Sequence, residues 1–108
     1  MQPERPGMKV EHGIKMTHVE LLDERILDEQ RIAELRESLE SVIEKNQDGR
    51  MLINFVNVQF MTSAMLGLLV RVHKKVCELG GKLELCNVDP SIRKIFEITQ
   101  LTKVLDIS

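Results

Sequence analysis

The feature that most constrains the fold is the alternation of strand and helix patterns in the second half of the chain. Residues 51–55 and 82–86 are short apolar segments of strand length, and residues 63–79 between them repeat their apolar positions with helical spacing. Gly80 and Gly81 are expected to end that helix, and Asp89 is expected to cap a third helix. Helices that alternate with strands predict a largely parallel sheet joined by right-handed crossovers.

The first half of the chain predicts a hairpin followed by a helix. Residues 9–11 and 14–21 have strand-like patterns separated by a break at residues 12–13, and the longer one alternates apolar with polar positions. Asp28 is expected to cap an amphipathic helix that ends near Lys45, because its apolar residues fall on one side.

These segments predict one α/β domain: a mixed, mostly parallel sheet of four to five strands with about three to four helices. A turn is expected at residues 46–49, and a last short strand within residues 101–107. Residues 1–7, with two prolines and a glycine, are interpreted as a flexible lead-in, and residues 8–108 as the domain.

The composition excludes several classes of protein. The formal charge is −2, and the chain has no tryptophan or tyrosine and only three phenylalanines. Neither a basic field nor stacking platforms are therefore available for direct nucleic-acid binding. No apolar run approaches the ~20 residues of a membrane helix, and the N-terminal residues lack a secretion-signal pattern. A cytoplasmic protein with no membrane partner is expected.

The usual signatures of enzymes are missing from the sequence. Neither GxGxxG nor GxxxxGK[ST] occurs, and His12, His18 and His73 lack the spacing of metal ligands. His73 is interpreted as a hydrogen-bonded core or boundary residue rather than a catalytic base. Cys77 and Cys86 are expected to be buried structural thiols. No catalytic residue, cofactor or metal is predicted.

Two adjacent hydroxyl groups, those of Thr62 and Ser63, lie where the strand at 51–55 and its loop pass into the helix. A hydroxyl at such a junction can cap the helix, which contributes ~0.5–2 kcal/mol. A phosphate there would meet the unpaired N–H groups of the first turn. Phosphorylation is therefore expected to leave the fold intact and to change the surface that a partner meets.

The helix that follows carries small residues near its start. Ala64 and Gly67 lie beside Leu68 at the edge of the apolar face, and they can let a partner approach closely. The alternative is a wide buried face in a small α/β domain. The basic residues on the opposite arc are interpreted as a solvated face rather than a phosphate-binding patch.

The chain resembles the STAS domain, named for sulfate transporters and anti-sigma factor antagonists. The resemblance is carried by residues 60–67 (Phe-Met-Thr-Ser-Ala-Met-Leu-Gly) and 80–83 (Gly-Gly-Lys-Leu), and by the ending at residues 87–96 and 101–104. It covers nearly all of residues 9–107, in the order and spacing of the family.

The resemblance implies a bacterial partner-switching regulator of transcription. In that family the unphosphorylated antagonist binds an anti-sigma factor, which is a serine kinase, and thereby frees the sigma factor. The kinase phosphorylates a serine or threonine at the start of the second helix, and a phosphatase reverses this. Ser63 occupies the acceptor position here. The implied partners are the anti-sigma factor serine kinase and a serine phosphatase, and the protein itself is expected to be a monomer or weak homodimer.

The sequence departs from the family at two positions near the acceptor. Thr62 stands where an aspartate is usual, which makes it a second possible acceptor. Met65 stands where a glycine is usual, and is expected to fill space at the docking face. The partner face is predicted to comprise Val56, Asn57, Val58, Gln59, Thr62, Ser63, Ala64, Met65, Gly67 and Leu68.

Two alternatives from other classes remain. The first is a STAS module that is never phosphorylated and serves as a scaffold or interaction domain. The second is a domain that binds a small ligand, such as a nucleotide, at the helix start at residues 62–65.

Overall fold

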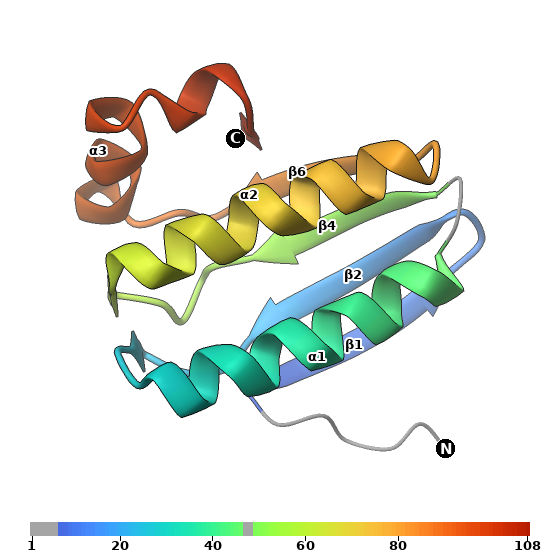
Figure 1. Ribbon diagram of the computed structural model, residues 1–108, viewed down its shortest axis with the longest axis horizontal. Helices are drawn as coiled ribbons and strands as arrows, with labels where there is room; N and C mark the ends of the chain where they lie inside the picture. Colours follow the sequence, from blue (N-terminus) through green and yellow to red (C-terminus); the bar gives the residue numbers. More distant parts are fainter. Residues whose placement is uncertain (1–6, 47–48) are drawn as a thin grey trace.

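The computed structural model describes residues 7–46 and 49–108, and shows a five-stranded sheet with the order β1-β2-β4-β6-β7 (Figure 1). Only β1 and β2 are antiparallel, and every other neighbouring pair in this sheet is parallel. This confirms the mixed, mostly parallel sheet. The strands are β1 (Met8–Gly13), β2 (Met16–Leu21), β4 (Arg50–Asn54), β6 (Lys82–Cys86) and β7 (Asp106–Ile107).

Within the described ranges there are three α-helices and one short 3-10 helix: α1 (Glu29–Lys45), α2 (Ser63–Glu78), α3 (Pro90–Ile98) and η1 (Leu101–Lys103). Figure 1 shows α1 and α2 side by side on one face of the sheet, with their N-terminal ends at the same edge. At that edge β3 (Arg25–Ile26) and β5 (Phe60–Met61) form a second, parallel pair.

The helix caps predicted at Asp28 and Asp89 are confirmed. The Asp28 carboxylate accepts a hydrogen bond of 2.8 Å from the backbone N–H of Gln30 at the start of α1. Asp89 accepts one of 2.9 Å from Ser91, with Pro90 in the first turn of α3. Gly80 follows α2 with a φ of 82°, a value that residues with a side chain rarely adopt. These local signals set where the helices begin and end.

The core lies between the sheet and the two helices α1 and α2. Alternate residues of each central strand point toward these helices, as the period of two requires. The largest fully buried side chains are Leu21, Ile26, Leu35, Leu39, Met51, Ile53, Phe55, Met65, Leu69, Leu85, Ile92 and Phe96. The rings of Phe55 and Phe96 meet edge to face with centroids 6.5 Å apart, which fastens α3 to the end of β4.

Two boundaries differ from the sequence-based expectation. The hairpin turns at residues 14–15 instead of breaking at 12–13, because Lys15 takes a left-handed φ of 56° and pairing extends to Gly13 and Met16. The expected strand within 101–107 is mostly η1, and only β7 is extended, after Gln100 turns with a φ of 60°. Of the turn at 46–49, residues 47 and 48 lie outside the described residues, as do residues 1–6 of the predicted lead-in.

The expectation of buried cysteines is wrong for Cys77. This residue lies on the exposed side of α2, one position past the buried Val76, and a step of one residue turns the side chain by about 100°. Cys86, at the end of β6, is half-buried. Burial and the neighbouring Glu84 carboxylate raise the pKa of the Cys86 thiol. Neither cysteine forms a disulfide.

Candidate functional site

The loop between β4 and β5 is held by hydrogen bonds that its own side chains and backbone make. The Asn54 side-chain oxygen accepts from the Val56 backbone N–H at 2.9 Å and from the Asn87 amide at 3.1 Å. The Asn57 amide donates to the Leu21 carbonyl at 2.9 Å. Backbone N–H groups of residues 59 and 60 both donate to the Glu24 carbonyl. The chain therefore enters α2 from a fixed direction.

Thr62 and Ser63 occupy different environments at the start of α2. Thr62 is the N-cap residue, with extended backbone, but its hydroxyl makes no cap hydrogen bond to the described residues. Its Oγ1 is buried and lacks a partner in the part of the chain that is described. Ser63 is the first helical residue and is exposed. The interpretation of these hydroxyls as helix caps is therefore wrong: the backbone N–H of Met65 bonds to the Thr62 carbonyl instead.

Seven of the ten residues predicted for the partner face reach the surface. Val56, Gln59, Ser63, Ala64 and Gly67 are exposed, and Asn57 and Thr62 are half-buried. Whether any of them contacts a partner remains a prediction.

The other three residues predicted for the face are buried: Val58 is 1% exposed, Met65 0% and Leu68 5%. Met65 and Leu68 are three residues apart, so they share the side of α2 that packs on the core. Met65 therefore fills the core, and the expectation that it fills space at a docking face is wrong. For Leu68, the wide buried face is the correct alternative.

The structure adds apolar residues that the sequence analysis did not assign to the site. Leu27 and Phe60 are 50% and 49% exposed, and Ile95 is 36% exposed. They border a hollow of about 430 Å³ between α3 and the β3–β5 pair. The Arg25 guanidinium lies over the Phe60 ring, 5.1 Å from its centroid. We call Leu27, Phe60 and Ile95 the apolar rim.

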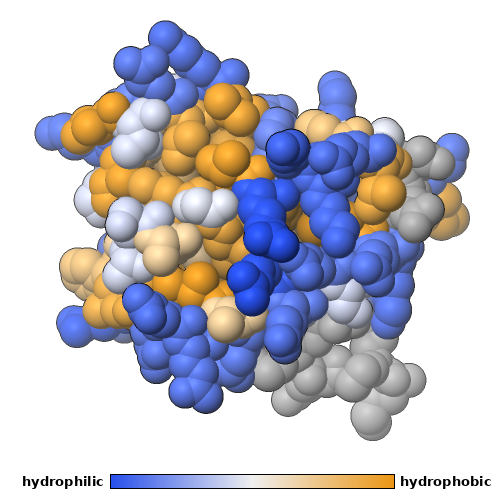
Figure 2. Space-filling model, viewed as in Figure 1, coloured by the Kyte–Doolittle hydropathy of each residue, from blue (hydrophilic) through white to orange (hydrophobic). Residues whose placement is uncertain are grey.

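Ile95 lies one turn of α3 after Ile92, which is 1% exposed, and it is the tertiary packing that leaves Ile95 at the surface. The space-filling view shows apolar atoms gathered toward the end of the molecule where α1 and α2 begin (Figure 2). Exposed apolar surface beside a hollow is typical of a site of protein contact.

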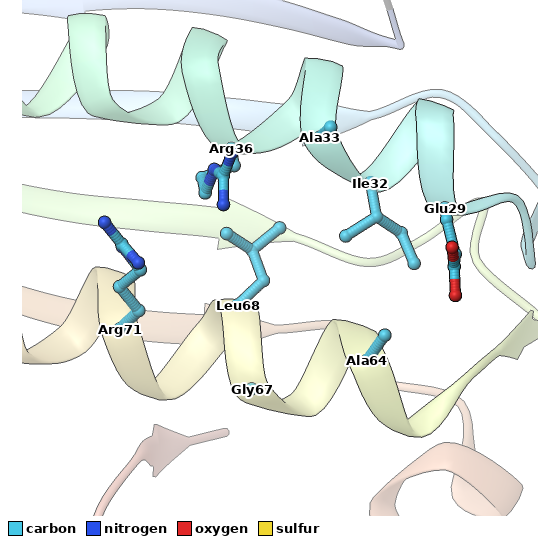
Figure 3. A pocket seen from close by; sticks show the side chains of 8 residues that line it. All are labelled: Glu29, Ile32, Ala33, Arg36, Ala64, Gly67, Leu68 and Arg71. Carbon is cyan, nitrogen blue, oxygen red and sulfur yellow. The ribbon is translucent and has the colours of Figure 1, made fainter.

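A second hollow, of about 340 Å³, runs between α1 and α2 (Figure 3). Ile32 and Leu68 lie at its base, and Ala64 and Gly67 of α2 lie along its side. Arg36 and Arg71 stand at one end, one from each helix. We call this hollow the interhelical groove.

His73 is half-buried on α2, in agreement with a boundary histidine, and its ring nitrogen Nε2 lies 3.7 Å from Cys77 Sγ. Among the described residues, no three histidine, cysteine or acidic side chains are grouped as metal ligands. No helix in residues 7–46 or 49–108 is both long and apolar enough to cross a bilayer.

Comparison with known proteins finds two anti-sigma factor antagonists among the relatives of this chain. The chain is 26% identical over 100 residues to the anti-sigma F factor antagonist of Paenibacillus polymyxa, covering 93% of this chain and 84% of that protein. It is 36% identical over 74 residues to the anti-sigma-B factor antagonist of Bacillus subtilis strain 168, covering 68% of this chain and 66% of that protein.

Solved structures share the fold. A STAS domain protein of Planctomyces limnophilus superposes with a TM-score of 0.83 at 23% identity, over 93% of this chain and 87% of the other. The Bacillus cell fate determinant SpoIIAA in its phosphorylated form gives a TM-score of 0.71 at 19% identity, over 94% and 90%.

The family comparison covers most of the domain described here. The family model for the STAS domain matches residues 24–108, which include the junction at Thr62 and Ser63, both hollows and all three α-helices. The chain therefore belongs to the STAS domain family.

Proposed function

We propose that this protein is an anti-sigma factor antagonist that regulates transcription by a phosphorylation-controlled partner switch. In its unphosphorylated form it binds an anti-sigma factor, and that anti-sigma factor is a serine kinase that phosphorylates Ser63. The observation that carries the proposal is the exposed Ser63 hydroxyl in the first turn of α2. The names of the relatives, two anti-sigma factor antagonists, support the class of partner.

The choice of Ser63 over Thr62 rests on access. A kinase must bring the γ-phosphate of ATP to the acceptor oxygen, and the Ser63 side chain is open to solvent. The Oγ1 atom of Thr62 is buried. Phosphorylation of Thr62 would first require the start of α2 to open, whereas Ser63 can be phosphorylated on the folded protein.

The folded protein can hold a phosphate on Ser63. The first turn of α2 contains no acidic side chain, and the positive end of the helix dipole favours an anion there. A phosphoserine carries about −1.5 to −2 charges at neutral pH. The fold is therefore retained while the surface at the start of α2 changes its charge.

The apolar rim explains how that charge releases the partner. Phe60 is three residues before Ser63, and with Leu27 it presents exposed apolar surface at the same edge of the domain. A partner that covers this surface must remove water from it, and a phosphate at its border resists that desolvation. Phosphorylation then weakens docking without a rearrangement of the fold.

In this proposal the protein is not an enzyme: the kinase transfers the phosphate, and a serine phosphatase removes it. The protein acts in the cytoplasm, where the sigma factor works, and it does not bind nucleic acid or a membrane itself.

Incubation with ATP and a serine kinase of the anti-sigma factor class tests the proposal. Trypsin releases the peptide from Met51 to Arg71, and mass spectrometry locates the phosphate within it. The expected result is one phosphate on Ser63, which is absent from Ser63→Ala and present in Thr62→Val.

The binding half of the proposal is tested by isothermal titration with the same kinase. Ser63→Asp should weaken binding. Ser63→Asn introduces a side chain of the same size as aspartate but without its charge, and should bind nearly as the wild type does. Absence of phosphate together with equal binding by both variants would instead identify a STAS module that is not switched.

A further inference from the structure

The interhelical groove is the feature that the proposed switch at Ser63 does not use. Its base is formed by Ile32 of α1 and Leu68 of α2, which are 9% and 5% exposed. The walls of the groove are lined by the short side chains of Ala33 on α1 and Ala64 on α2, as Figure 3 shows. The groove starts within one turn of Ser63, so it continues the surface at the helix start.

Gly67 has no role in the packing of this fold. Apart from its chain neighbours and the nearby backbone of α2 itself, a Cβ atom at Gly67 would meet no atom of the described residues within 4 Å, and the backbone there is ordinary helix. A glycine in the interior of a helix destabilises it relative to alanine. The fold therefore keeps a residue that weakens α2 without gaining internal space. Close approach of another backbone from outside is a use that accounts for it.

The charges of the groove are unequal along its length. Arg36 and Arg71 lie at one end and Glu29 lies at the other (Figure 3). Arg71 forms an ion pair of 3.3 Å with Glu40, but Arg36 forms none with any side chain in the described residues. The Arg36 guanidinium is therefore available to bind an anion of a partner. Arg71, at the same end of the groove, can contribute to that contact.

The groove favours a helix as its occupant. It is walled by two helices, whose backbone N–H and C=O groups along the groove are paired within each helix beyond the first turn. A segment that lies there finds no strand edge to pair with, which favours an element that pairs its own backbone groups. An α-helix does so, and small residues on the receiving helix let its axis come close.

We propose that the interhelical groove receives an amphipathic helix of the anti-sigma factor kinase, with its closest approach at Gly67 and a carboxylate against Arg36 and Arg71. This inference rests on the proposed function, because it assigns the groove to the same partner. It adds a second contact region, separate from the phosphorylated serine, that fixes how the partner lies on the domain.

Affinity measurements on the full chain with the purified kinase test the charge contact. Arg36→Glu should weaken binding about tenfold, the effect typical of a residue that matters at an interface. Lys74→Glu makes the same change of charge on an exposed position of α2 outside the groove, and should bind as the wild type does. Equal affinity of Arg36→Glu and Lys74→Glu would overturn the charge contact.

A graded series at Gly67 tests the close approach. Gly67→Ala should reduce affinity and Gly67→Leu should reduce it further, while both variants stay folded because a side chain there has open space. Full affinity in Gly67→Leu would show that nothing approaches α2 at this point, and would overturn the proposal.

A photo-crosslinking amino acid at position 33 identifies the occupant. The expected product joins this position to an acidic helical segment of the kinase, whereas the same group at position 74 gives none. Crosslinking of position 33 to a second copy of this chain would overturn the proposal in favour of a homodimer.

The binding measurements distinguish an error in the groove inference from an error in the proposed function. If Ser63→Asp abolishes binding but the groove variants do not, the switch stands and the groove is not its docking site. If the wild-type protein does not bind the kinase at all, the proposed function is wrong and the groove inference falls with it.

Discussion

The hydroxyl of Ser63 is exposed at the start of α2, while that of Thr62, its neighbour in the chain, is buried without a hydrogen-bond partner among the described residues. The two adjacent residues thus differ in the exposure of their side chains. The helix begins between them, and the first helical residue turns outward while the N-cap residue turns toward β3, where its backbone N–H bonds to Ile26. Of the two, only Ser63 is accessible to a kinase without opening of the helix start.

Replacement of Thr62 by valine tests the state of the buried hydroxyl. The two side chains have nearly the same shape, and removal of an unpaired buried hydroxyl does not sacrifice a hydrogen bond. We expect the free energy of unfolding to stay equal or to rise by up to about 1 kcal/mol. Urea unfolding measures this. A loss of about 1 kcal/mol or more would show that the hydroxyl does cap the helix.

Aspartate at position 63 tests whether the helix start accepts negative charge. Because the first turn of α2 has no acidic residue, Ser63→Asp should raise the free energy of unfolding by about 0.5 kcal/mol relative to Ser63→Asn. Thermal unfolding at low salt measures the difference, and added salt should reduce it. If the aspartate variant is the less stable of the two, a phosphate at this position would strain the fold.

Alanine at position 67 separates the stability of α2 from its proposed contact. Gly67→Ala should raise the free energy of unfolding by about 1 kcal/mol, because alanine favours the helix and meets open space. Gly80→Ala is the matched control and should lower it by about 1 kcal/mol or more, since Gly80 has a φ of 82°. Destabilisation by Gly67→Ala in urea unfolding would mean that the glycine serves the fold.

The cap of α3 predicts a dependence of stability on acid pH. Hydrogen bonds from the Ser91 hydroxyl and backbone N–H lower the pKa of Asp89 from its ordinary value of 3.8. The folded state therefore favours the charged carboxylate. Its contribution is fully present above the ordinary value and is lost as the pH falls through the lowered one.

Asp89→Asn provides the comparison for this pH dependence, because asparagine also caps helices but does not titrate. Urea midpoints recorded from neutral pH down to about pH 2 should show a larger acid-induced loss for the wild type than for the variant. Parallel curves for the two proteins would contradict the assignment.

If the partner covers the apolar rim, a substitution in the rim should weaken partner binding and leave the fold intact. Phe60 is 49% exposed, so Phe60→Ser should change stability little, yet it should weaken kinase binding about tenfold if the ring is covered in the complex. Ile98→Ser is the matched control, because Ile98 is 72% exposed and does not border the hollow. Equal losses of affinity in both variants, measured by titration, would exclude a specific role of the rim.

Much of the fold could be predicted from sequence because its signals are local. The caps at Asp28 and Asp89 act on backbone groups two residues away. The strand at residues 82–86 was predicted with the boundaries that the structure has, since its alternation lies between a double glycine and a turn.

The candidate site was harder to predict, because exposure at the edge of a domain depends on segments far apart in the chain. Met65 and Val58 were placed on the surface by their proximity to Ser63, yet both are buried. The β3–β5 pair joins residues 25–26 to 60–61, and neither segment is long enough to give a strand pattern. Phe60 belongs to that pair and is 49% exposed.

The parallel course of β4 and β6 places the start of α2 and the start of α3 at one edge of the domain, where α1 also begins. The dipoles of α1 and α2 thus direct their positive ends toward the same side, as Figure 1 shows. This arrangement belongs to the topology and not to any one side chain. A negative charge on an exposed residue in the first turn of either helix therefore meets a favourable field.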